Sequence, residues 1–188
     1  IFTVFITLVF LISCSSDDSP GEDNDEPTGG NHTYEIAISD GFLGGTNLEG
    51  SVANGDFSGM YFEYEGSRIL NLTLGSSTSD FYAGGAVVLA NGQSSSALND
   101  EYDTESGGST LIITFKKDGE SYTLVSVSGT CTVSNLKMYG VQGVGIGGAS
   151  YNLNFSGTFR QENYDGPDED KPIMQMSGAL DVKKLTTE

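Results

Sequence analysis

The alternation of apolar and polar residues is the feature that most constrains the fold of this chain. From Asn31 onward no stretch of ten or more residues has the apolar spacing of a helix, whereas apolar residues often recur at every second position. Successive side chains of a strand point to opposite faces, so this pattern predicts strands with one buried face. We expect strands at 33–39, 48–53, 58–65, 68–75, 86–90, 110–117, 125–133, 151–160 and 173–182. The predicted fold is all-β, an antiparallel β-sandwich or partly closed barrel of about nine or ten strands.

Turn residues and glycines refine this prediction. Asp118-Gly119 follows one alternating run and supplies the positive φ angles of a tight hairpin turn. A recurring Ser-Gly pair places Gly129, Gly157 and Gly178 on the inward faces of their predicted strands. Glycine weakens a strand unless its space is needed, so we expect these glycines to make room for aromatic rings or to mark bulges. A glycine-lined ligand groove is the functional alternative.

The chain has two cysteines, Cys14 and Cys131. Cys131 lies in "VSVSGTCTV", where alternation puts Val125, Val127, Gly129 and Val133 on the same face. No basic residue in that strand would lower the pKa of its thiol. We therefore expect Cys131 to be a small buried hydrophobe.

Acidic residues dominate the charge. The 188 residues contain 26 acids and 8 bases, for a formal net charge of −18. Such a surface repels phosphate backbones and anionic lipid headgroups, so nucleic-acid binding is disfavoured. We interpret the excess negative charge as a contribution to solubility. Binding of divalent cations is the alternative that gives the acidic residues a specific function.

The first 12 residues, "IFTVFITLVFLI", form an apolar run. A spanning helix needs about 20 apolar residues, so this run is too short to cross a membrane, but it fits the core of a signal peptide. Because the chain begins at Ile1 rather than Met, we expect this peptide to be truncated at its start. Leu11-Ile12-Ser13-Cys14 then resembles the lipobox of bacterial lipoproteins. That resemblance implies cleavage before Cys14, lipidation of its thiol and attachment to a membrane.

The residues after Cys14 have the composition of a disordered tether. The stretch "SSDDSPGEDNDEPTGGN" has no large apolar side chain and holds six acids, so it cannot bury enough surface to offset its ordering entropy. We assign residues 1–13 to the signal peptide, 14–31 to the lipid-anchored acidic tether and 32–188 to a single β domain. Serine after the cysteine and acids soon afterwards ("CSSDD") resemble the surface-export signal of Bacteroidetes lipoproteins. The implied location is the outer membrane, with exposure on the cell surface.

The β domain also resembles uncharacterised β-rich surface lipoproteins of Bacteroidetes. The resembling segments are "NLTLGSSTSDFY", "LNDEYDTESG", "VSGTCTV" and "YNLNFSGTF". The resemblance implies an all-β fold at the cell surface and no known activity, so it assigns no functional residue.

Catalytic motifs are absent from the sequence. "GVGIGG" at 143–148 has the letters of a dinucleotide-binding fingerprint, but it opens no helix within a βαβ unit, and we interpret it as a loop. His32 is the only histidine and lies at the end of the tether, so Ser–His, Cys–His and zinc chemistry lack their residues. We predict no catalytic residue and no cofactor apart from a possible Ca²⁺ ion.

Two acidic clusters are candidate Ca²⁺ sites, because Ca²⁺ prefers oxygen ligands. The first consists of Asn99, Glu101, Asp103 and Glu105, and the second of Asp165, Asp168, Glu169 and Asp170. Solvated acidic loops are the alternative for both. Four tyrosines, Tyr61, Tyr82, Tyr102 and Tyr164, are candidates for stacking on a ligand, although some of them are expected in the core.

The leading functional hypothesis is a lipid-anchored surface β-sandwich that acts as a non-catalytic binding module for a glycan or a protein. A lipocalin-like carrier is the second hypothesis and requires a sizeable apolar cavity. A surface glycan hydrolase is the third and requires two close carboxylates in a cleft.

Overall fold

The computed structural model describes residues 30–53, 59–76, 79–100, 108–140 and 146–184. These ranges contain strands, one 3-10 helix and no α-helix, which confirms the all-β prediction. No helix within them is long and apolar enough to span a membrane. The elements are β1 His32–Ile38, β2 Thr46–Val52, β3 Met60–Tyr64, β4 Ser67–Leu74, β5 Phe81–Ala90, β6 Ser95–Asn99, β7 Gly108–Lys117, β8 Glu120–Gly140, β9 Ile146–Gln161, η1 Asp168–Asp170 and β10 Ile173–Val182.

All ten strands belong to one sheet, in the order β2-β1-β10-β9-β3-β4-β5-β7-β6-β8. In addition, β8 pairs with both β7 and β9. These pairings connect the strands into a hydrogen-bonded ring of β9, β3, β4, β5, β7 and β8. Neighbouring strands are antiparallel except for β6 and β7, which pair in parallel through two residues each. The predicted antiparallel arrangement therefore holds apart from this short pairing.

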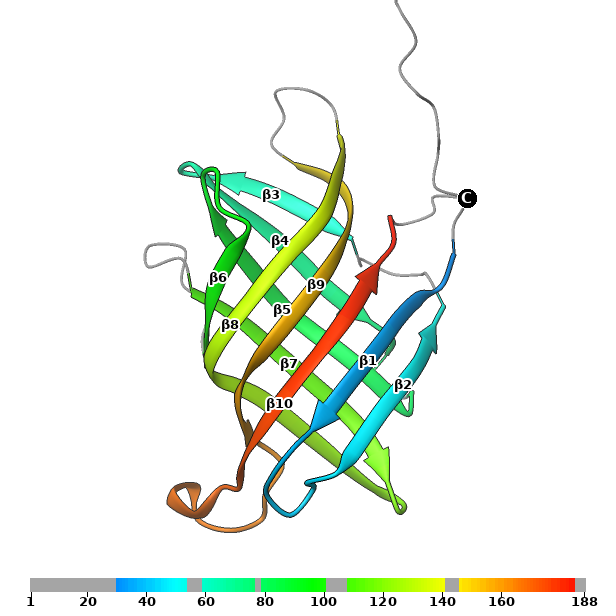
Figure 1. Ribbon diagram of the computed structural model, residues 1–188, viewed down its shortest axis with the longest axis vertical. Helices are drawn as coiled ribbons and strands as arrows, with labels where there is room; N and C mark the ends of the chain where they lie inside the picture. The colour runs from blue at the N-terminus through cyan, green and yellow to red at the C-terminus, as the bar shows by residue number, and fades with distance from the viewer. Residues whose placement is uncertain (1–29, 54–58, 77–78, 101–107, 141–145, 185–188) are drawn as a thin grey trace, which may run out of the picture.

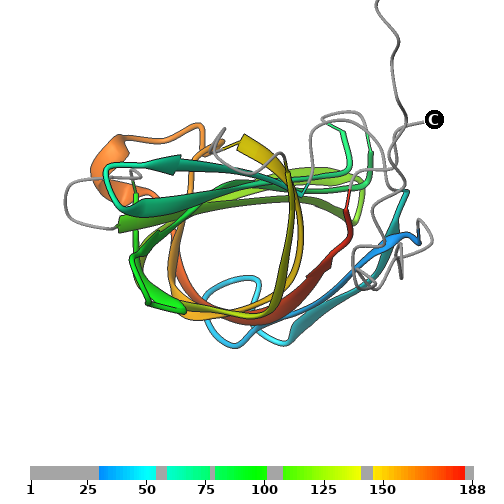
Figure 2. The same cartoon turned by 90° about the horizontal axis from the view of Figure 1, so that it is seen from above.

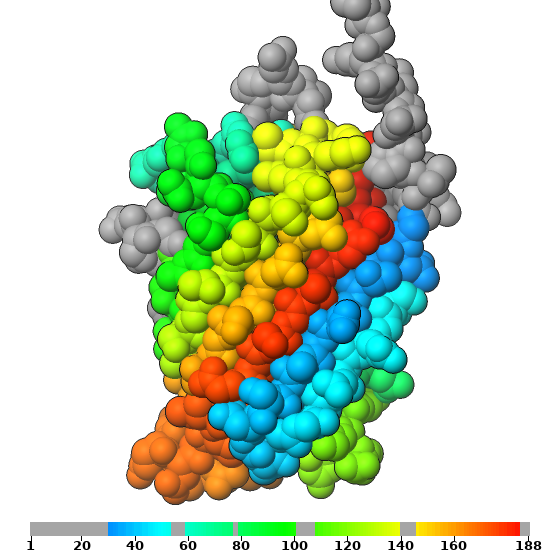
Figure 3. All heavy atoms as spheres, viewed as in Figure 1, coloured from blue at the N-terminus to red at the C-terminus, as the bar shows by residue number. Residues whose placement is uncertain are grey.

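The ring is flattened into two layers (Figures 1 and 2). In the view of Figure 1, β8, β9, β10, β1 and β2 lie toward the viewer, and β3, β4, β5 and β7 cross behind them. Figure 3 shows the near layer as a continuous surface of oblique strands. Contacts between aromatic rings join the layers, because Tyr34 of β1 stacks on Phe81 of β5 with ring centroids 3.5 Å apart.

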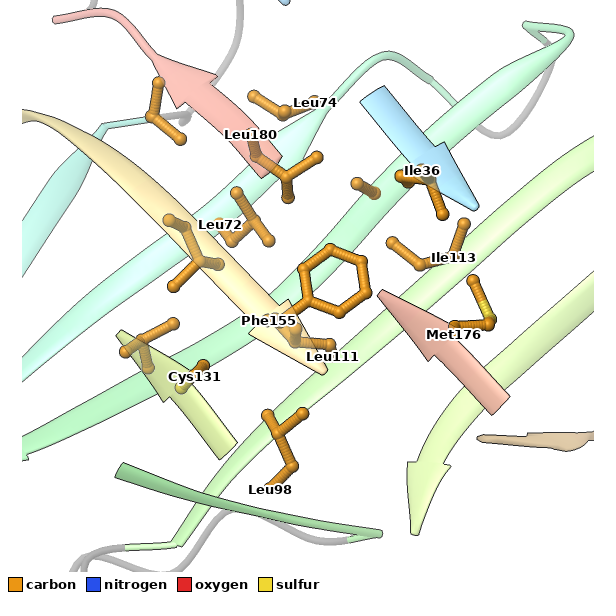
Figure 4. Packing of buried hydrophobic residues seen from close by; sticks show 14 of the residues in the cluster. Ile36, Leu72, Leu74, Leu98, Leu111, Ile113, Cys131, Phe155, Met176 and Leu180 are labelled. Carbon is orange, nitrogen blue, oxygen red and sulfur yellow. The ribbon is translucent and has the colours of Figure 1, made fainter. Parts of the chain in front are cut away.

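The space between the layers is filled with apolar side chains. Phe155 of β9 lies among Leu72, Leu111, Ile113 and Met176, which come from three other strands, β4, β7 and β10 (Figure 4). The alternation in the sequence predicts this core well, because the residues expected to face inward in β4, β7, β9 and β10 are buried. Cys131 is also buried and unbonded to another cysteine, as expected.

One bulge corrects the predicted face of β8. Ser126 pairs with Phe159 and Ser128 pairs with Thr158, so Val127 is an extra residue in the ladder. An extra residue reverses the alternation, and Val125 is therefore half-buried on the outer face while Cys131 faces the core. The prediction that Val125 shares the face of Cys131 is wrong for this reason.

Two glycines beside the bulge let the backbones approach closely. Gly129 pairs with Gly157 across β8 and β9. Gly129 has a φ of 139°, and a Cβ atom there would lie 2.5 Å from the Cα atom of Gly157. A Cβ atom at Gly178 would lie 3.0 Å from Cζ of Phe155. The expected space for an aromatic ring is therefore present at Gly178, whereas Gly129 lies two residues beyond the bulge at Val127 and allows two backbones to approach closely.

Buried serines complete the hydrogen bonding where β6 enters the sheet. The hydroxyl of Ser126 accepts a bond of 3.0 Å from the N–H of Leu111 and donates one of 2.6 Å to the carbonyl of Asn99. The hydroxyl of Ser109 similarly accepts a bond of 2.9 Å from the N–H of Val88. These side chains replace strand pairing and keep buried N–H groups satisfied.

Two local predictions have different outcomes. Asp118 and Gly119 have φ angles of 54° and 88°, which confirms the tight turn between β7 and β8. In contrast, residues 146–148 are not in a loop. They form the first part of β9, where Gly147 and Gly148 pair with both β3 and β8 and Ile146 pairs with β3, whereas residues 143–145 of the predicted loop lie outside the described residues.

Candidate functional site

The candidate site is a groove on the outer face of β4, β5 and β7, which points away from the viewer in Figure 1. Its volume of about 650 Å³ is within the range of about 300–1,000 Å³ that is usual for ligand pockets. Its lining combines apolar and polar side chains. The lining residues are Asn71, Leu72, Thr73, Tyr82, Gly85, Ala86, Asp100, Thr110 and Ile112.

Tyr82 lies along the sheet within this groove. A Cβ atom placed on Gly84 would lie 2.7 Å from Cζ and 2.8 Å from Cε1 of Tyr82, so the ring occupies the space above that glycine. Side chains of a strand normally stand roughly perpendicular to the sheet, and only the missing side chain of Gly84 allows this ring to lie down. The tyrosine is half-buried and keeps part of its ring open to the groove.

The strand register explains the shape of the groove. Gly84 pairs with Thr73 of β4 on one side and with Ile112 of β7 on the other. Ala86, two residues further along β5, similarly pairs with Asn71 and Thr110. The middle strand therefore contributes small side chains and the ring of Tyr82, while its neighbours contribute larger and mostly polar side chains. The result is a channel along β5 with an aromatic floor and hydrogen-bonding walls.

Thr110 is the most unusual residue of the groove. It is 8% exposed, and its hydroxyl has no hydrogen-bond partner among the described residues. A buried hydroxyl without a partner costs about 1–3 kcal/mol, so such groups are rare unless a water or a ligand completes them. The γ-methyl and γ-hydroxyl of threonine have similar sizes, and a rotation about χ1 exchanges their positions.

One carboxylate lies at the end of the groove. Oδ2 of Asp100 is 3.9 Å from Nη1 of Arg160, and Nη2 of the same guanidinium is 2.7 Å from Oε1 of Glu162. Two carboxylates therefore share the positive charge of Arg160. Lys171 is a second cation beside Glu162, with Nζ 2.8 Å from Oε2 of the carboxylate. The hydrogen bond from Lys171 is the main reason that the pKa of the Glu162 carboxyl lies below its usual value.

The candidate tyrosines do not gather at one place. Tyr61 is 7% exposed and packs in the core, so its prediction as a stacking residue is wrong. Its neighbours Phe62 and Tyr64 face outward instead. Tyr164 is exposed, but it lies with Tyr122 in a separate hollow. Tyr102 lies outside the described residues. Tyr82 is thus the only candidate placed in the groove by the described part of the chain.

The acidic clusters have no metal-binding geometry in the described residues. Asn99 ends β6, and its carbonyl accepts a bond from Ser126, whereas Glu101, Asp103 and Glu105 lie outside the described ranges. Asp165, Asp168, Glu169 and Asp170 are exposed around η1, and Asp168 forms an ion pair with Lys171. Nowhere in the described ranges do three or more His, Cys, Asp or Glu side chains gather as metal ligands. The first cluster stays a prediction.

Other reactive groups have structural surroundings. His32 begins β1, where it is buried and its Nδ1 atom accepts a bond of 3.0 Å from the N–H of Lys183. Burial raises the pKa of the Cys131 thiol and of the Tyr151 hydroxyl, which keeps both groups protonated at neutral pH. Glu35 and Glu49 are cross-strand neighbours beside a second hollow, on β1, β2 and β10, and both are exposed.

Sequence reasoning identified Tyr82 but missed its surroundings. The signal that could have located the groove is "FYAGGA", in which the outward positions after Tyr82 are Gly84 and Ala86. Small outward residues beside an outward aromatic residue predict a ring that lies on the sheet. No protein-family model matches the chain, and no curated protein or solved structure matches it either.

Proposed function

We propose that this protein is a lipid-anchored recognition module that binds a glycan in the groove on β4, β5 and β7. The observation that carries the proposal is the ring of Tyr82, which lies on Gly84 at the floor of a polar-walled groove. The C–H face of a sugar ring stacks on the electron-rich face of an aromatic ring, and the flanking hydroxyl and amide groups supply directional hydrogen bonds. Asn71, Thr73 and Thr110 are in position to do so.

The rigid sheet supports this function better than a flexible loop would. Tyr82, Asn71 and Thr110 all lie on strands inside the ring of hydrogen bonds. Their positions are therefore set before a ligand arrives, and little ordering entropy is lost on binding.

The other two hypotheses receive less support from the structure. A carrier needs apolar space between the layers, and that space is occupied by core side chains from every strand of the ring. A hydrolase needs two carboxylates on either side of a bound sugar. Asp100 is the one carboxylate among the described residues that line the groove, and the paired Glu35 and Glu49 lie on an exposed face of the opposite layer.

The anchor and location belong to the same proposal. We propose that lipid on Cys14 attaches the chain to the outer membrane and that the acidic residues after it form a tether. Replacing Cys14 with serine should abolish incorporation of labelled fatty acid while the β domain still folds. Labelling that survives Cys14→Ser would contradict the anchor. Exposure on the outer leaflet predicts that protease added to intact cells digests the wild-type protein, and resistance of the protein to that protease would contradict it.

Binding to an array of oligosaccharides tests the recognition function. We expect the protein to bind a subset of the array, Tyr82→Ala to abolish that binding, and Tyr164→Ala to retain it. Tyr164 is the matched control because its ring also lies over a glycine, Gly166, but in a different hollow. Absence of binding by the wild-type protein, or equal binding by Tyr82→Ala, would contradict the proposal. Repeating the array with and without CaCl₂ tests the Ca²⁺ cluster around 99–105 separately.

A further inference from the structure

We infer that the glycan is an uncharged sugar chain and that the hydroxyl of Thr110 forms a hydrogen bond with it that the free protein lacks. This inference rests on the proposed function and names the ligand class for the same groove. Three observations carry it: the position of Thr110, the absence of a partner for its hydroxyl among the described residues, and the charge of the groove.

Thr110 lies where a sugar stacked on Tyr82 would extend. The tip of the Tyr82 ring reaches above Gly84, and the next outward position on β5, Ala86, has Thr110 as its neighbour on β7. Thr110 lines the groove beside Ala86, and although its Oγ1 atom is buried in the free protein, a rotation about χ1 would turn the hydroxyl toward a bound sugar. A sugar on the ring would therefore place its hydroxyl groups beside Thr110 and, across the groove, beside Asn71, which also pairs with Ala86.

The unpaired hydroxyl of Thr110 has an energetic consequence. In the free protein it is buried and has no partner among the described residues. Valine has the same shape without the hydroxyl, so Thr110→Val should stabilise the free protein rather than destabilise it. Functional sites often retain residues that lower the stability of the free protein. Thr110 fits this pattern if a bound ligand supplies the hydrogen-bond partner of its hydroxyl.

The charges around the groove favour an uncharged ligand. Among its described lining residues Asp100 is the only charged one, and the nearby guanidinium of Arg160 is already paired with Asp100 and Glu162. Among the described residues that line or border the groove, no unpaired positive charge is available for a carboxylate or sulfate on the ligand. The chain as a whole has a formal charge of −18, which adds long-range repulsion of anionic polymers.

The test uses the full chain with two sets of probes. The neutral set contains hexasaccharides of glucose, mannose, galactose and xylose, and the anionic set contains hexagalacturonate and a sulfated galactan oligomer. We expect binding to at least one neutral probe and none to the anionic probes at low salt, where electrostatic repulsion is strongest. Preferential binding of an anionic probe would overturn the inference about charge.

Substitutions at Thr110 test the hydrogen bond. For the neutral probe that binds most tightly, Thr110→Val should weaken affinity about tenfold, which is the loss of one hydrogen bond of about 1.4 kcal/mol. The same variant should unfold about 2–4 °C higher than the wild type, as expected when a buried hydroxyl without a partner is removed from a domain of this size. Thr110→Ser, which keeps the hydroxyl, should retain affinity to within about threefold.

The outcomes separate this inference from the proposed function. If Tyr82→Ala abolishes binding while Thr110→Val leaves affinity unchanged, the groove binds the glycan but Thr110 does not contact it. If Thr110→Val both weakens binding and lowers the unfolding temperature, the hydroxyl is already paired in the free protein, which overturns the inference. If Tyr82→Ala binds like the wild type, the proposed site itself is wrong.

Discussion

The two faces of β5 differ in what they contribute. The inner face consists of Phe81, Ala83, Val87 and Leu89, which are buried in the core, with Gly85 between them. The outer face has Tyr82 followed by Gly84 and Ala86, and there the small residues leave a groove instead of a filled layer. Small residues on the inner face therefore allow close packing of backbone, whereas small residues on the outer face leave room for a ligand.

Replacing an inward glycine and an outward glycine with alanine should give the largest difference in stability between the two faces of the sheet. At Gly129 a Cβ atom would clash with the backbone of Ser156 and Gly157, and its φ of 139° suits no other residue. We expect Gly129→Ala to destabilise the protein by about 4 kcal/mol or more. At Gly84 the atoms nearest to the added Cβ belong to the movable ring of Tyr82. Gly84→Ala should cost less than about 1 kcal/mol, yet displace the ring and abolish glycan binding.

Urea unfolding of both variants, combined with the oligosaccharide array, measures this difference. Equal destabilisation by the two substitutions would show that the outer face is as tightly packed as the inner one. That result would contradict the description of the groove.

Adjacent residues of β4 offer the second test. Leu72 is 1% exposed within the core, and Thr73 is its half-buried neighbour on the outer face. Leu72→Ala should lower the free energy of unfolding by about 2–5 kcal/mol, because it leaves a cavity. Thr73→Ala should lower it by less than about 0.5 kcal/mol. Chemical denaturation of each variant checks this, and similar losses would show that the two faces are not distinct.

The buried serines predict an effect of intermediate size. Ser126→Ala removes the acceptor of the Leu111 N–H and should cost about 1–3 kcal/mol, because that buried donor is left unpaired. Ser128 is exposed in the same strand, and Ser128→Ala is the matched control with an expected change below about 0.5 kcal/mol. Faster exchange of the Leu111 amide in Ser126→Ala would report the lost bond directly. An unchanged exchange rate would mean that another group satisfies this amide.

The smallest expected effect concerns pH. The hydrogen bond from Lys171, with help from Arg160, holds the pKa of Glu162 below its usual value of 4.5. The resulting stabilisation is present above that usual value and is lost as the pH falls through the lowered pKa of the folded state. The unfolding temperature should therefore decrease on acidification from about pH 5, and less steeply in Glu162→Gln. The exposed Glu169 has no ion pair among the described residues, so Glu169→Gln should keep the wild-type slope. An identical slope in Glu162→Gln would contradict this role.

The sequence predicts the inner face of the sheet better than the rest. Burial imposes alternation on long strands such as β4, β7 and β9, so their core residues are identifiable without a structure. β6 was not predicted, because "SSALN" has a single large apolar residue, Leu98, and its position depends on pairing with β7 and β8. The bulge at Val127 was also invisible, since the valines around it keep an unbroken alternating pattern while the register shifts.

The candidate site was predicted only in part, for a related reason. Tyr82 is a visible outward aromatic residue, but its neighbours in the groove come from positions 71, 73, 110 and 112 on other strands. Only the strand register brings these residues together, and alternation within one strand does not specify it. Tyr61 was misplaced because Met60 and Phe62 on either side are also apolar, so local alternation cannot identify the inward residue.

The claim that the outer face of β5 binds a neutral glycan is tested most directly by mapping amide chemical shifts during titration with such an oligosaccharide. The account predicts that the largest changes fall on Thr73, Gly84, Ala86, Thr110 and Ile112, around the ring of Tyr82. Changes confined to β1, β2 and β10, or to the hollow around Tyr164, would contradict it.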